Sequence, residues 1–148
     1  MRKNLNILAS GDYEETISHN GLRLTKQRRE VFDVLRAQPD HPTATEVFMR
    51  VKTQLPNISL ATVYNCLETL VECGLVKQVN VDRAPTRFCP NLKEHGHFVC
   101  DSCHHVYDIE LAAANPSTAC QYELPEGYFV TSREVTLRGH CPKCSTRN

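Results

Sequence analysis

Apolar side chains recur at helical spacing through the first half of the chain, in four segments separated by turn residues. These segments span residues 12–21, 24–38, 41–56 and 59–74. The last three begin at or near residues that commonly cap helices, namely Thr25, Thr43 and Ser59. Glu46 follows Thr43 by three residues, which is the spacing of a capping box. The pattern therefore predicts four helices, the last of which ends at Gly74.

The helix predicted over residues 59–74 has one apolar and one polar face. Its apolar face carries Leu60, Val63, Leu67, Leu70 and Val71. Its outer face carries Thr62, Tyr64, Asn65 and Glu68. Two short strands, 75–81 and 85–90, follow around a turn-like segment. Three helices followed by a hairpin describe a winged helix, in which the last helix enters the DNA major groove and the hairpin lies along the backbone.

The second half has a different pattern, with short strands separated by cysteine and histidine residues. The strands are expected over residues 97–100, 106–109 and 128–139. A connecting helix is expected within 111–127, although two prolines interrupt its pattern. The change of pattern near Asn91 divides the chain into a helical domain, 1–84, a hinge, 85–91, and a mixed domain, 92–148. The expected fold class is α+β.

Charge and composition exclude only a few classes of function. Seventeen lysine and arginine residues balance seventeen acidic residues, so net charge does not indicate a nucleic-acid partner. Residues 23–29 nevertheless concentrate four cations, Arg23, Lys26, Arg28 and Arg29. We find neither a signal peptide nor an apolar run of membrane-spanning length, and we expect a soluble, cytoplasmic protein. Eight cysteines without a secretory signal favour metal binding over disulfides.

Four of these cysteines form two Cys-x-x-Cys pairs, Cys100 with Cys103 and Cys141 with Cys144. Each such turn presents two thiolates, and two turns complete a tetrahedral Zn²⁺ shell without an open position. The pattern therefore predicts a structural zinc site that attaches the C-terminus to the strand at 97–100. Cys66 and Cys73 fall in an apolar helical pattern and are expected in or near the core. Cys120 has no partner in sequence and is expected to be incidental.

A second set of candidate ligands surrounds the first pair of cysteines. His95 and His97 lie two residues apart, on one side of an extended strand. Cys89 precedes them at the end of the hairpin, and Asp108 lies on the next strand. His41 is the best candidate for a further ligand from the helical half, ahead of His19. Such a site would couple ligand binding to domain orientation; the alternative is a polar strand with two surface histidines.

Several of these motifs occur together, in order and at characteristic spacing: "GLRLTKQRREVFDVL", "HPTATEVF", "PNISLATVYNCLETLVECGLV", "TRF", "HGHFVCDSC", "VYDI" and "GHCPKC". Along nearly its whole length the chain resembles the ferric uptake regulator (Fur) family. The resemblance implies a dimeric, metal-dependent repressor with an N-terminal winged-helix DNA-binding domain and a C-terminal αβ dimerisation domain. Its expected partners are a second copy of the chain and a palindromic DNA operator, without a membrane or a small-molecule substrate.

The resemblance also assigns residues. It implies that the four paired cysteines hold structural Zn²⁺. It implies that a second, regulatory Fe²⁺, Mn²⁺ or Zn²⁺ ion binds His41, Cys89, His95, His97 and Asp108. Tyr64 matches a tyrosine that reaches the bases, beside Thr62 and Asn65. The cations at 23–29 are expected at phosphates, with a solvated helix start as the alternative.

Two departures from the common family pattern point to different signals. Asp108, where many members carry Glu, resembles the peroxide-sensing branch, in which His41 and His95 match the histidines that gain oxygen. Cys89 replaces a carboxylate, and a thiolate shifts preference toward Zn²⁺, as in zinc sensors. Cys89 could instead be a redox-active thiol. Arg133 stands where a histidine of the family's accessory metal site is expected, which argues against that site. We favour peroxide sensing, with zinc or iron availability as the alternative.

Functions of other classes fit less well. An enzyme would need a metal with an open position beside a general base such as Glu94 or Glu110, and the chain carries no substrate-binding signature. A zinc-stabilised protein-interaction module without DNA binding would leave the helical half unexplained. The sequence does not distinguish a dimer from a tetramer.

Overall fold

The structure, a computed structural model, describes residues 12–111, 124–131 and 133–145. It divides into two compact units, residues 1–92 and 93–148, called here the N-terminal and C-terminal units. Within the described residues, no helix combines the length and apolarity that crossing a bilayer requires.

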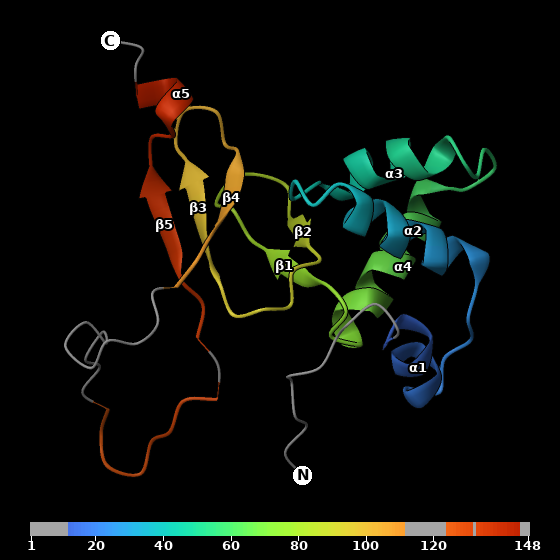
Figure 1. The fold of residues 1–148 in the computed structure, drawn as a ribbon, viewed down its shortest axis with the longest axis horizontal. Coiled ribbons are helices and arrows are strands. Elements are labelled where there is room, and N and C mark those ends of the chain that lie inside the picture. Colours follow the sequence, from blue (N-terminus) through green and yellow to red (C-terminus); the bar gives the residue numbers. More distant parts are fainter. Residues whose placement is uncertain (1–11, 112–123, 132, 146–148) are drawn as a thin grey trace. The chain divides into compact units, whose positions relative to one another are not determined.

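The N-terminal unit contains four helices and a hairpin (Figure 1). Its elements are α1 (Asp12–His19), α2 (Lys26–Ala37), α3 (Ala44–Lys52), α4 (Leu60–Glu72), β1 (Lys77–Val79) and β2 (Arg87–Cys89). The predicted caps are present: the side chains of Thr25, Thr43 and Ser59 accept hydrogen bonds from backbone amides of the first turns. Thr43 and Glu46 form the complete capping box. Gly74 follows α4 with φ +73°, a conformation that glycine adopts without strain.

The core of this unit lies where α2, α3 and α4 pack against one another. Val63, Leu67 and Leu70 are buried as predicted, whereas Leu60 is 37% exposed and Val71 is only partly buried. Leu60 is the first residue of α4, so no preceding turn covers it. The hairpin closes the core, because Phe88 of β2 joins the same buried cluster.

The C-terminal unit is built on a three-stranded sheet of order β4-β3-β5. Its elements are β3 (Gly96–Cys100), β4 (Val106–Ile109), β5 (Thr136–Gly139) and the short helix α5 (Pro142–Ser145). Strand β3 is central, antiparallel to β4 and parallel to β5. The chain therefore returns from a distant segment to pair beside β3 (Figure 1). The two cysteines that follow β5, Cys141 and Cys144, thereby come close to Cys100 at the end of β3.

This unit differs from the sequence-based expectation at its last strand. The strand predicted over 128–139 forms only at Thr136–Gly139, and residues 128–131 belong to no strand. The reason is register: β5 runs parallel to β3, Thr136 pairs with His97, and the His97 N–H donates to the Val135 carbonyl, so residues well before Val135 lie beyond the beginning of β3 at Gly96. Most of the helix predicted within 111–127 falls in residues 112–123, outside the described chain, as does Cys120.

Candidate metal centres

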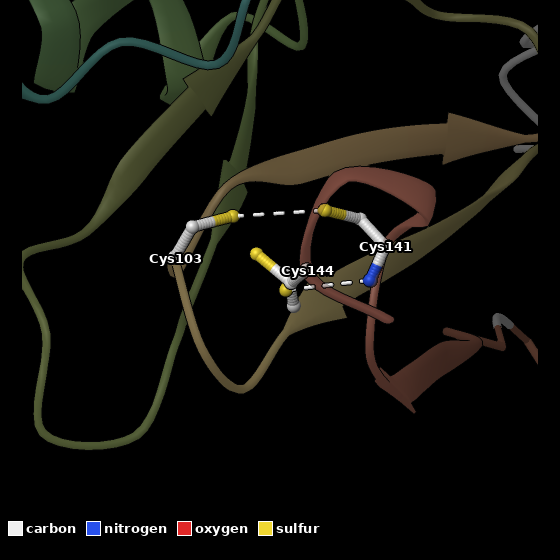
Figure 2. Close-up of side chains that lie close together, drawn as sticks. Cys103, Cys141 and Cys144 are labelled. Atoms are coloured by element: carbon white, nitrogen blue, oxygen red, sulfur yellow. Dashed lines mark hydrogen bonds between the residues drawn. The ribbon is translucent and has the colours of Figure 1, made fainter. Parts of the chain in front are cut away.

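Four cysteine thiols meet at one end of the sheet in the C-terminal unit (Figure 2). Cys100 ends β3, Cys103 lies in the turn before β4, Cys141 follows β5, and Cys144 belongs to α5. Their Sγ atoms all lie within 4.8 Å of one another. The Sγ atoms of Cys103 and Cys141 are 3.9 Å apart, too far for a disulfide. Four sulfurs at about 2.3 Å from a tetrahedral Zn²⁺ would be about 3.8 Å apart, so the cluster fits this ion.

The pKa values of the cysteines in this cluster also favour a bound cation. The backbone N–H of Cys103, followed by that of Cys141, stabilises the Cys100 thiolate and lowers the pKa of Cys100 to about 5. The hydrogen bond between the Cys144 thiol and the side chain of Cys141 raises the pKa of Cys144 to about 12. Several thiolates cannot crowd together without a neutralising charge, and a bound dication supplies it. The shell is complete and suits a structural site rather than a catalytic one.

Three further donors meet elsewhere in the C-terminal unit, and we call them the C-terminal trio: His95, His97 and Asp108. Strand pairing sets His97 opposite Asp108. Nε2 of His95 lies 3.1 Å from Nε2 of His97, and these nitrogens lie 3.2 and 3.5 Å from Oδ1 of Asp108. Ligands at about 2.1 Å from one metal ion are separated by about 3.0 Å at right angles and about 3.4 Å in a tetrahedron. The spacing of the trio therefore matches three ligands of one ion.

The tautomer of His95 also suits a ligand. Its Nδ1 lies 2.6 Å from the carbonyl oxygen of Lys93. A carbonyl can only accept a hydrogen bond, so Nδ1 carries the proton in the neutral ring and Nε2 keeps its lone pair. Metal-binding histidines are commonly held by such a hydrogen bond on the other ring nitrogen. The i, i+2 spacing of the two histidines correctly predicted that they share one side of the chain.

The N-terminal unit holds two more of the predicted ligands, which we call the N-terminal pair: His41 and Cys89. His41 lies between α2 and α3 and is 3% exposed; Cys89 ends β2 and is 1% exposed. A ring nitrogen of His41 and Sγ of Cys89 lie within 4.8 Å of each other. An imidazole and a thiolate together suit zinc and related transition metals. His19, the weaker candidate, is exposed on α1.

Sequence reasoning missed the polar side chains that surround His41. Arg87 Nη1 donates to the carbonyl oxygen of His41 at 2.9 Å. Asp40 is held by Arg50 in a two-pronged ion pair at 2.9 and 2.8 Å. The hydrogen bond from Arg50 lowers the pKa of Asp40. No short-range motif links these positions; only the position of Asp40 beside His41 could have drawn attention to it.

The predicted DNA-contacting residues lie in two different environments. Tyr64 is 52% exposed on the outer face of α4, and Asn65 beside it is also exposed. The hydroxyl of Thr62 lies 2.8 Å from that of Ser59, within the cap of the helix. Arg23 and Lys26 are exposed.

The other two cations of residues 23–29 are engaged within the unit. Arg29 pairs with Asp33 at 2.9 Å and with Glu14 at 3.2 Å. The half-buried Arg28 donates to the carbonyl of Arg23. This burial and this hydrogen bond indicate that Arg28 helps to stabilise the N-terminal unit.

Comparison with known proteins agrees with this architecture. The sequence model of the ferric uptake regulator family matches residues 19–136. The chain therefore belongs to the Fur family, whose members are dimeric, DNA-binding transcription regulators rather than enzymes. The fold class and the family expected from the sequence are confirmed.

Among individual relatives, peroxide regulators recur. The peroxide operon regulator of Bacillus subtilis is 30% identical over 133 residues, covering 90% of this chain and 91% of that protein. The peroxide-responsive repressor PerR of Staphylococcus aureus is 29% identical, with 92% and 93% coverage. The solved structure of the Campylobacter jejuni peroxide stress regulator superposes with a TM-score of 0.66 at 32% identity, covering 89% of this chain and 98% of that one. The Helicobacter pylori ferric uptake regulator, at 22% identity and a TM-score of 0.71, shares the fold.

Proposed function

We propose that this protein is a metal-dependent transcriptional repressor in which one regulatory ion binds the N-terminal pair together with the C-terminal trio. The observation that carries the proposal is the spacing of the trio, because three donor atoms 3.1–3.5 Å apart are close enough together to bind one ion. An ion that also takes His41 and Cys89 as ligands connects the two units. Binding then favours one relative orientation of the units over all others.

The preferred orientation is the one in which a dimer presents two recognition helices at the spacing of a palindromic operator. In each copy, α4 enters the major groove with Tyr64 and Asn65 on its exposed face. Arg23 and Lys26 supply phosphate contacts, which add affinity without sequence information. A shift from about 1% to about 99% of the DNA-binding form requires about 10⁴-fold tighter metal binding to that form. Five preorganised ligands can supply this difference, whereas two surface histidines cannot.

The exposed apolar side chains of the C-terminal unit support the proposal that the protein forms a dimer. Several of its described apolar side chains are exposed: Leu124, Tyr128, Phe129, Val130 and Leu137. Exposed apolar surface of this kind is typical of protein interfaces, and a second copy of the chain is the partner that palindromic DNA requires. Structural Zn²⁺ on the four paired cysteines would hold this unit in the form that dimerises.

The signal that we favour is peroxide. Similarity to the peroxide regulators supports it, as does Asp108 among the ligands. With Fe²⁺ bound, H₂O₂ would transfer one oxygen atom to a ligand imidazole: the O–O bond breaks, a ring C–H carbon becomes oxygenated, and water leaves. The modified ring is a poorer ligand, so the metal and then the DNA are released. Cys89 supports a second candidate, a sensor of zinc availability, because its thiolate is a soft ligand.

The hinge site is tested by His97→Ala, with His19→Ala as a matched control on exposed α1. We expect His97→Ala to abolish metal-dependent retardation of an inverted-repeat duplex, while zinc content and melting stay those of the wild type. His19→Ala should behave as the wild type. Metal-independent operator binding by His97→Ala would refute the hinge site. Absence of DNA binding by the metal-loaded wild type on every operator tried would favour a protein-interaction module.

The signal is tested by peptide mass mapping of anaerobic, Fe²⁺-loaded protein after a brief exposure to dilute peroxide. One added oxygen on the peptide of His41 or His95 supports peroxide sensing through the metal. Oxygen on Cys89 alone indicates a thiol sensor. An unmodified protein whose iron site is occupied indicates a sensor of metal availability, and zinc is then the first metal to test.

A further inference from the structure

His41 has a backbone conformation that ordinary residues seldom adopt. Its φ is +56°, in the left-handed region, and the residue is 3% exposed. Histidine adopts this conformation more readily than most residues other than glycine, and Arg83 and His104 adopt it at exposed positions of this chain. His41 differs in being buried, and strained backbone that the surrounding structure holds in place concentrates at functional sites. The contacts that hold this residue therefore bear on its role.

Strand β2 supplies the first of these contacts. Arg87 Nη1 donates to the carbonyl oxygen of His41 at 2.9 Å, and the backbone N–H of Phe88 donates to the carbonyl of Pro42 at 3.0 Å. An isolated antiparallel bridge joins Thr43 to Arg87. The segment from His41 to Thr43 thus lies along the same short strand that ends in Cys89. One strand fixes both members of the N-terminal pair.

Helix α3 supplies the second group of contacts. Arg50, in its last turn, donates two hydrogen bonds to Asp40. Gln38, at the end of α2, donates a third to Asp40 from its Nε2 at 3.0 Å. Thr43, two residues after His41, is the N-cap of the same helix. Arg87 Nη1 also lies 3.8 Å from the carboxylate of Glu46, the other half of the capping box. The backbone around His41 is therefore connected to both ends of α3.

We propose that Arg87 is a positioning residue for the regulatory metal: it holds the His41 carbonyl so that the imidazole stays beside Cys89, and it links this pair to the first turn of α3. This inference rests on the proposed function, because it assumes that His41 is a ligand. Arg87 is not itself a ligand, since a guanidinium has no lone pair to offer. Its effect on the metal passes through the backbone of His41. The same link gives metal binding a route to a helix of the DNA-binding unit.

The experiment measures Co²⁺ affinity of the zinc-loaded protein by titration, following the thiolate-to-cobalt absorption that Cys89 would produce. Arg87→Met removes the donor and keeps an unbranched apolar stem. Arg87→Lys keeps a charge but loses the rigid planar fork. Arg83→Met, at an exposed turn of the same hairpin, is the matched control, and His41→Ala reports on the ligand itself. Zinc content and melting of the Co²⁺-free protein are recorded for every variant.

Loss of a group that orients a ligand typically weakens metal binding about 10- to 100-fold. We expect a loss of that size in Arg87→Met, a smaller loss in Arg87→Lys, and none in Arg83→Met, with zinc content and cooperative melting retained. A purely structural role would instead lower the melting temperature and leave Co²⁺ affinity of the folded protein unchanged.

The outcomes separate this inference from the proposed function. Wild-type Co²⁺ affinity in Arg87→Met, together with weakened binding in His41→Ala, overturns the role of Arg87 and leaves the hinge site standing. Wild-type affinity in His41→Ala overturns both. Should Arg87→Met not fold, Arg87→Lys decides: an affinity equal to that of the wild type overturns the proposal.

Discussion

Replacement of Cys100 by serine is the sharpest test of how the C-terminal unit is held together. Among the described residues of this unit, the buried apolar side chains and cysteines are Val99, Cys100, Val106 and Cys141. Two of these four are candidate zinc ligands. The part of the unit described therefore has a small core without the metal, whereas the N-terminal unit has a large continuous one.

The free energy that zinc binding contributes to folding exceeds that of the buried valines. Full burial of a valine contributes about 1.5–3 kcal/mol, so the two valines supply about 3–6 kcal/mol. Structural zinc contributes about 10–16 kcal/mol to the folding of small zinc domains. Serine is a poor zinc ligand, and Cys100→Ser also removes the thiolate that the backbone N–H groups of Cys103 and Cys141 stabilise. We expect zinc to be lost and the β4-β3-β5 sheet to unfold, while the N-terminal unit remains folded.

The assay combines metal analysis with hydrogen exchange read separately for the two units. Cys73→Ser is the matched control, because Cys73 is half-buried at the end of α4 in the N-terminal unit. Cys100→Ser should lose bound zinc and the amide protection of β3 and β5, whereas Cys73→Ser should keep both. A Cys100→Ser protein that binds no zinc and yet retains protected strands would refute the reasoning, since the sheet would then be stable without its metal.

Two further predictions concern the N-terminal unit. The pKa of Asp40 is lowered by Arg50, so this pair stabilises the fold above about pH 4 and its contribution disappears as the pH falls through the lowered pKa. Both side chains are partly exposed, which limits the effect to about 0.2–1 kcal/mol. The melting curves of Asp40→Asn and the wild type should differ at pH 6 and converge toward pH 3; a constant difference would contradict this. Leu67→Ala, at a core position 1% exposed, should cost about 2–5 kcal/mol in urea unfolding without changing zinc content, and a loss below about 1 kcal/mol would contradict the packing described for α4.

The choice between peroxide and zinc as the signal depends on chemistry at three candidate ligands. His41 and His95 would be the sites of oxygen transfer, and Cys89 would be the ligand that favours a softer ion. Burial of Cys89, at 1% exposure, limits direct attack by solutes on its sulfur. This burial favours a ligand role for Cys89 over that of a freely accessible redox thiol.

Local interactions explain why many elements could be predicted from the sequence. A cap depends on residues within one turn, so Thr25, Thr43 and Ser59 marked the helix starts correctly. The alternation along a strand depends on neighbouring residues, so the shared side of His95 and His97 could be predicted as well. Each Cys-x-x-Cys pair likewise depends on a single turn, and the need of Zn²⁺ for four ligands allowed the two pairs to be grouped before any fold was known.

What only the tertiary structure decided depends on contacts between distant segments. The length of β5 follows from where β3 begins, which no local pattern near 128–139 records. Arg87 contacts His41 across 46 positions of sequence, and Arg50, in the last turn of α3, contacts Asp40, which precedes that helix. The sequence by itself predicted most of the helices and strands, the candidate ligands and the family. The spacing of the trio and the hydrogen bond from Arg87 to the His41 carbonyl form only when the strands and helices pack. Packing alone brings side chains that are remote in sequence to within hydrogen-bonding distance.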